Sequence, residues 1–263
     1  MRETVSPYGK REFTQGSVFS GLETSAGNPC MGIIITARCD LEHRKLNKIV
    51  CLPVYRFLDW MTLYGDEDIF EKSKYDVIQQ LDALLIKYGL SYESFRVFKS
   101  DEVIRFLTEK KIKKTEQDKI EQFSDFLENK KIKCGVKSVL ENEKKYLECL
   151  FNHSKANVYF IEGLMGDKSE AYIIDLGEPI TLSMQVIVDI DKILYFQKYN
   201  RSKNTLYKSL HIKESEEAKF LSTLNSPYTE HLLQRFSQFY SRIGTEDISS
   251  DTLSIIKDIY EKR

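Results

Sequence analysis

The stretch that most constrains the fold is residues 31–55, which read MGIIITARCDLEHRKLNKIVCLPVY. Its first part, GIIIT, is a continuous apolar and β-branched run, which is typical of a buried central strand. A short charged turn carrying Cys39 and Asp40 follows, and IVCLPV then resumes the strand pattern. Pro53 lacks a backbone N–H, so we expect it at a strand end or a bulge. This unit predicts a sheet around which the rest of the chain packs.

The hydrophobic period changes twice along the chain. Helical spacing follows the first strands, and strand-like segments return with NVYFIEG, AYIIDLG and ITLSMQVIVDI. From Glu214 the pattern is helical again, with Ser226 and Pro227 as a helix start signal. We therefore expect a single α+β unit over residues 1–263. Its parts are a small, mostly antiparallel β-sheet or SH3-like barrel from residues 13–57 and 156–196, a large helical insertion over 58–155, and C-terminal helices over 214–261.

The helix after Ser226 should carry one apolar stripe that packs on the barrel. The stripe consists of Leu232, Leu233, Phe236, Phe239, Tyr240 and Ile243. The insertion is rich in both Lys and acidic residues. This mixture indicates a solvated helical face with many ion pairs.

Composition restricts the partners and the compartment. The formal net charge is −1, so attraction to nucleic acid would need a local basic patch. The five cysteines are scattered and the first residues lack the apolar core of a secretion signal, which favours reduced thiols in a cytoplasmic protein. No run approaches the roughly 18 apolar residues of a membrane span, so we expect no membrane association.

Cys39, Asp40 and His43 are the candidate catalytic residues. Cys39 directly follows the apolar strand, and nearby basic side chains favour a reactive thiolate. His43 is close enough in sequence to act as its base if the turn is helical. In the structural alternative, Cys39 is a small buried residue and Asp40 holds the turn by accepting backbone N–H groups and pairing with Lys45 or Arg38. We favour the structural alternative.

A metal site is less consistent with the spacing of cysteines and histidines. Zinc sites typically contain close pairs such as Cys-x-x-Cys, and this sequence has none. The two looser groups are Cys30, Cys39, His43 and Cys51, and Cys134, Cys149 and His153. Motifs for nucleotide binding and for common hydrolases are also missing. We therefore expect neither a metal nor another cofactor.

Residues 192–213 form a basic aromatic segment. They contain six Lys or Arg, four aromatic residues and no acidic residue. Cations that neutralise phosphate, interleaved with rings that stack on bases, are typical of nucleic-acid surfaces. The candidate residues are Lys198, Tyr199, Arg201, Lys203, Tyr207 and Lys208. The alternative is a strand and loop whose rings face the core.

Three segments, FTQGSVF, GIIITARCDLEHRK and LNSPYTEHLLQRFSQFYSRIG, resemble a family of bacterial proteins of similar size. Its recurring features are a QGD-like opening, a Thr-x-x-Cys-Asp-Leu/Ile turn with a nearby Lys, and a closing SPY…F…R-x-G helix. The matching positions are Gln15, Gly16, Thr36, Cys39, Asp40, Leu41, Lys45, Ser226, Pro227, Tyr228, Phe236, Arg242 and Gly244. Ser17, which replaces an acid, and the pair Ala37–Arg38 depart from the pattern.

The resemblance implies a place in bacterial defence islands or mobile elements, beside ATPases or regulatory proteins, and implies no reaction. The favoured hypothesis is a non-catalytic interaction or regulatory subunit of an anti-phage defence or mobile-element system. Its partner would be a protein such as an ATPase or sensor encoded nearby, bound by the charged helical insertion. The second hypothesis is a nucleic-acid-binding protein or toxin-like nuclease that uses residues 192–213. A thiol-dependent hydrolase built on Cys39 is the third.

Overall fold

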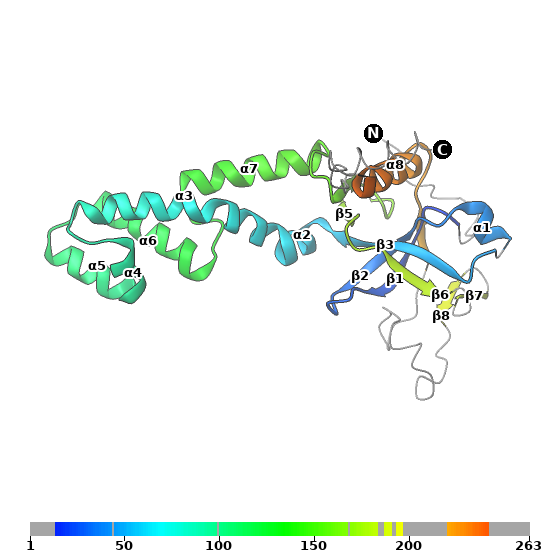
Figure 1. Cartoon of the computed structure of the whole chain (residues 1–263), viewed down its shortest axis with the longest axis horizontal. Coiled ribbons are helices and arrows are strands. Elements are labelled where there is room, and N and C mark those ends of the chain that lie inside the picture. The colour runs from blue at the N-terminus through cyan, green and yellow to red at the C-terminus, as the bar shows by residue number, and fades with distance from the viewer. Residues whose placement is uncertain are drawn as a thin grey trace, which may run out of the picture.

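A computed structural model of the chain describes residues 14–43, 45–98, 100–167, 169–183, 187–190, 193–196 and 220–241. It confirms the α+β class (Figure 1). A curled antiparallel sheet forms the base, a long group of helices extends from one side of it, and a C-terminal helix lies against the sheet.

The sheet combines strands from both ends of the described chain. Its order is β4 (Val158–Glu162), β5 (Ala171–Asp175), β3 (Lys48–Arg56), β2 (Pro29–Ile34), β1 (Ser17–Glu23) and β9 (Phe220–Thr223), and β6 (Ile180–Ser183) also pairs with β3. Strands on either side of the helical insertion therefore share one sheet. The expected β region, 156–196, extends too far, because β7 (Ile187–Ile190) and β8 (Ile193–Phe196) form a separate two-stranded sheet.

The central strand β3 changes partner at Pro53. On one side it pairs continuously with β2. On the other side its first residues, up to Cys51, pair with β6, and its last residues, from Val54, pair with β5. Pro53 is thus inside a central strand, opposite Gly32 in regular register, and neither at a strand end nor at a bulge as its missing N–H suggested. The position tolerates proline because it falls between the two pairings.

Alternating residues of the strands face two different cores. Val18, Ile33 and Leu52 belong to the core beneath the C-terminal helix, whereas their neighbours Phe19 and Ile34 belong to a second core on the opposite face. This is the period of two that a pleated strand imposes. Register shifts in β1, against both β2 and β9, contribute to the curl of the sheet.

The insertion forms a helical arm, residues 57–151, that projects from the sheet (Figure 1). Its helices are α2 (Phe57–Trp60), the π-helical turn η1 (Met61–Gly65), α3 (Asp66–Ile86), α4 (Tyr92–Val97), α5 (Ser100–Glu109), α6 (Lys114–Asn129) and α7 (Lys137–Phe151). The arm has its own apolar core, which continues into the sheet through Tyr55, Val158 and Ile173. The continuous core joins the arm to the sheet.

The C-terminal region differs in part from the expectation of helices from Glu214. Residues 220–223 form strand β9, which adds to the edge of β1. The helix α8 (Tyr228–Ser241) then lies over the sheet. Its stripe packs as expected, because Leu232 is buried in the sheet core and Phe236 and Phe239 are partly buried against it. Ile243 and the expected last helix lie outside the described residues.

In the described part of the chain, no helix combines the length and the apolar character that crossing a membrane requires.

Candidate functional site

The three segments on which the family resemblance rests come together at one end of the sheet. Gly16 donates its amide to the carbonyl of Ile34 at 2.8 Å and accepts from the amide of Leu224 at 2.9 Å. It has a positive φ of 85°, and an added Cβ would lie 3.0 Å from the hydroxyl of Thr229. Only glycine fits this position without strain or displacement. Gln15 extends the contact, since its side-chain amide donates to the carbonyl of Ile35 at 3.0 Å.

Thr36 connects the end of β2 to β3. Its hydroxyl accepts the amide of Val50 at 2.7 Å and donates to the carbonyl of the same residue at 3.4 Å. Thr36 is almost fully buried. The hydroxyl therefore both accepts and donates a hydrogen bond to the backbone of Val50. These two bonds take the place of backbone hydrogen bonds between the strands where β2 has ended.

The turn after Thr36 is the short helix α1 (Arg38–Glu42), and it does not match either expectation for Asp40. Ala37 occupies the N-cap position, and no side chain caps the helix. Arg38 pairs with Glu42 at 3.1 Å, so it does not pair with Asp40. Among the described residues no cation pairs with the Asp40 carboxylate, and the first backbone hydrogen bonds of the helix run to the carbonyl of Ala37.

Cys39 also differs from the structural expectation, because its side chain is exposed. Its sulfur lies 3.8 Å from a carboxylate oxygen of Asp40. Among the described residues, the hydrogen-bond partner of the thiol is therefore this acid, and no hydrogen bond joins the thiol to His43, the base that a nucleophile would need. The backbone of Lys45 donates to the Asp40 carbonyl, and this contact involves no side chain of either residue.

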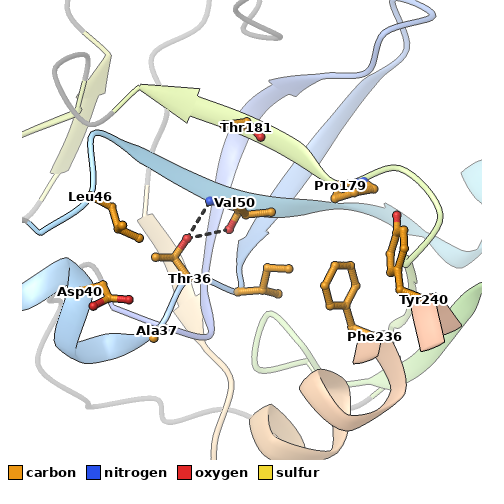
Figure 2. A pocket seen from close by; sticks show the side chains of 10 residues that line it. Thr36, Ala37, Asp40, Leu46, Val50, Pro179, Thr181, Phe236 and Tyr240 are labelled. Atoms are coloured by element: carbon orange, nitrogen blue, oxygen red, sulfur yellow. Dashed lines mark hydrogen bonds between the residues drawn. The ribbon is translucent and has the colours of Figure 1, made fainter. Parts of the chain in front are cut away.

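An open pocket of about 460 Å³ lies between α1, β3, β6 and α8 (Figure 2). Its walls are mostly apolar. The lining residues are Ile35, Thr36, Ala37, Asp40, Leu46, Val50, Pro179, Thr181, Phe236 and Tyr240. Figure 2 shows Asp40 and Leu46 at one end and the rings of Phe236 and Tyr240 at the other. The volume falls within the range of small-ligand sites.

Polar contacts hold α8, and with it one wall of the pocket, against the edge of the sheet. The hydroxyl of Tyr159 lies 3.1 Å from Nδ1 of His231. The guanidinium of Arg235 donates to the carbonyl of Lys155 at 3.1 Å. The helix is therefore positioned by hydrogen bonds to Tyr159 and Lys155 and by its apolar stripe.

The cysteines do not assemble a metal site in the part of the chain that the structure describes. There, no group of three or more Cys, His, Asp or Glu side chains is placed to hold a metal ion. Cys30 is half-buried, and burial raises the pKa of its thiol to about 12. Burial also raises the pKa of Cys51, whose sulfur donates to the carbonyl of Ile180. Both thiols are therefore packing residues.

The predicted nucleic-acid residues, which are Lys198, Tyr199, Arg201, Lys203, Tyr207 and Lys208, lie outside the described residues. Arg242 and Gly244 of the resemblance lie outside them as well. The structure therefore brings together Gln15, Gly16, Thr36, Asp40 and Phe236 from the sequence predictions. It adds Leu46, Val50, Pro179, Thr181 and Tyr240 to the site.

Some of the added residues carried a signal in the sequence. Tyr240 follows Phe236 by four residues, which places the two rings on one helical face. The sequence gives no sign that Pro179 and Thr181 belong to the site, because no local pattern predicts that β6 pairs with the first half of β3. No protein-family model, curated protein or solved structure matches this chain.

Proposed function

We propose that this chain is a non-catalytic protein-binding subunit, and that the pocket between α1 and α8 receives its partner. The convergence of three segments from opposite ends of the chain on one open pocket carries the proposal. Gly16 and Thr36 position its frame, and Asp40 and Phe236 line it. The resemblance of these same segments supports a role in a bacterial defence or mobile-element system.

The chemistry of the pocket favours binding over reaction. Thr36 uses its hydroxyl on Val50, so it presents its methyl group and no reactive oxygen to a ligand. Cys39 does not belong to the pocket lining. What remains is an apolar surface with two aromatic rings and one carboxylate, and aromatic side chains are enriched at protein–protein interfaces.

The helical arm offers a competing surface. Leu140 on α7 is 45% exposed, close to the 43% of Leu46 at the pocket. The sequence alone favoured the arm as the partner-facing element. The arm side chains form many ion pairs within the arm itself, such as Lys130 with Glu67 at 2.8 Å. Exposed ion pairs of this kind contribute little to the free energy of folding, and they indicate a solvated helical face.

The matched exposure of the two leucines provides the test. We would compare Leu46→Glu with Leu140→Glu in the full chain, expressed together with its neighbouring genes. The readouts are co-elution of a stoichiometric partner and protection of the cells from plaque formation under phage challenge. We expect Leu46→Glu to lose both and Leu140→Glu to keep both. Loss in Leu140→Glu with retention in Leu46→Glu would assign binding to the arm, and the pocket proposal would be wrong.

A further inference from the structure

Among the described residues that line the pocket, Asp40 is the one charged residue. It is half-buried, at the opposite end from Phe236 and Tyr240 (Figure 2). Thr36 at the centre is fully hydrogen-bonded to the backbone of Val50. The most strongly polar group that a ligand meets is therefore the Asp40 carboxylate.

This carboxylate has no cationic partner among the described residues. Arg38, on the same helix, pairs with Glu42 at 3.1 Å. Lys45 contacts Asp40 only through its backbone amide, which donates to the Asp40 carbonyl. The thiol of Cys39, 3.8 Å away, is at the outer limit of a sulfur hydrogen bond and carries no positive charge. A ligand that covers Asp40 therefore meets a negative charge that no described side chain compensates.

The rest of the pocket suits an apolar chain. Ile35, Leu46 and Val50 contribute aliphatic surface, and the rings of Phe236 and Tyr240 lie 4.9 Å apart between centroids. A purely apolar ligand would remove water from Asp40 without replacing its hydrogen bonds, which is unfavourable. A ligand with an aliphatic stem and a cationic end fits both the apolar walls and the Asp40 carboxylate. Lysine and arginine side chains have this form.

We infer that the pocket binds a basic side chain, lysine or arginine, presented by an exposed segment of the partner protein. The aliphatic stem lies over Ile35, Leu46 and Val50, and the cation pairs with Asp40 at the α1 end of the pocket. This inference rests on the proposed function and adds the chemistry of the partner. It assigns Asp40 a binding role in place of the capping role expected from the sequence.

Three blocked pentapeptides of the form Gly-Gly-X-Gly-Gly test the inference, with X as lysine, norleucine or glutamate. Norleucine retains the lysine stem and lacks the ammonium group. Each is titrated into the full chain while the methyl NMR signals of Ile35, Leu46 and Val50 are recorded. We expect the lysine peptide to bind about fivefold more tightly than norleucine, the range of a partly exposed ion pair. The glutamate peptide should leave the signals unchanged.

Two variants distinguish a specific ion pair from general attraction. Asp40→Asn should remove the preference for lysine over norleucine. Glu42→Gln, which makes the same charge change on the same helix outside the pocket lining, should preserve it. Equal binding of lysine and norleucine, a lysine preference that persists in Asp40→Asn, or no methyl shift with any peptide would each overturn the inference.

The inference and the proposed function can fail separately. If partner co-elution is lost in Leu46→Glu but unchanged in Asp40→Asn, the pocket is the binding site and the basic side chain is not its ligand. If the lysine peptide binds as expected while Leu46→Glu retains the partner, the pocket prefers basic groups and the proposed function is wrong.

Discussion

Removing the hydroxyl of Thr36 should destabilise the fold and expose the end of β3. Thr36→Val keeps the branched shape of the side chain and deletes the oxygen that accepts the Val50 amide at 2.7 Å. Thr36 is only 8% exposed, so water does not readily replace that oxygen. A buried donor left without an acceptor costs about 1–3 kcal/mol. Because valine fills nearly the same volume, little of this cost arises from a cavity.

Thr181→Val is the matched control, since Thr181 lines the same pocket but is exposed. Surface substitutions of this kind change stability by less than about 0.5 kcal/mol. Urea unfolding followed by circular dichroism gives the free-energy differences, and hydrogen exchange at the Val50 amide reports the broken bond directly. Equal losses in the two variants, or unchanged exchange at Val50, would refute the assignment of the Thr36 hydroxyl as the acceptor that holds the Val50 amide.

Three further predictions concern stability. Burial raises the pKa of the Asp175 carboxyl from 3.8 to about 6. Between about pH 4 and 6 the folded state keeps this carboxyl protonated while the unfolded chain loses the proton, so stability falls as the pH rises through 6. Asp175→Asn should thus exceed wild type by about 1–3 kcal/mol at pH 7.5 and match it near pH 4 in urea melts; a pH-independent difference would contradict this. Phe236→Ala should cost about 1.5–3 kcal/mol, less than a core Phe, because Phe236 is only partly buried; a loss below about 0.5 kcal/mol would show that the ring does not pack on the sheet. Asp40→Ala should cost under about 0.5 kcal/mol, since no amide of the described residues donates to its carboxylate; a larger loss of stability by calorimetry would show that Asp40 has a structural role.

The sheet and the arm could be predicted because their signals are local. The apolar runs on either side of α1 indicate strands, and the change to helical spacing after β3 indicates the insertion. Strand β9 was missed because its four residues follow a charged stretch, and its pairing with β1 joins positions about 200 residues apart. Pairing with β1, and not local propensity, makes this segment a strand.

The candidate site was only partly visible in the sequence. Thr36 and Asp40 were singled out, but the role given to Asp40 was wrong because Ala37 occupies the cap position. The placement of Pro53 inside β3 could not be predicted either, since it requires knowing that β5 and β6 share one side of that strand. The pocket needs α1, β6 and α8 to meet, and sequence spacing does not show their meeting point.

The most direct test of the account is site-specific photo-crosslinking in living cells. A benzophenone side chain is placed at Leu46 beside the pocket or at Leu140 on the arm, two positions of nearly equal exposure. We predict that the benzophenone in place of Leu46 crosslinks one defined protein and that the benzophenone in place of Leu140 yields no such product. Phe236→Ser should abolish the crosslink from the first position while the variant stays folded. A crosslink from Leu140 alone, or one from Leu46 that is indifferent to Phe236→Ser, would contradict the claim that the pocket receives the partner.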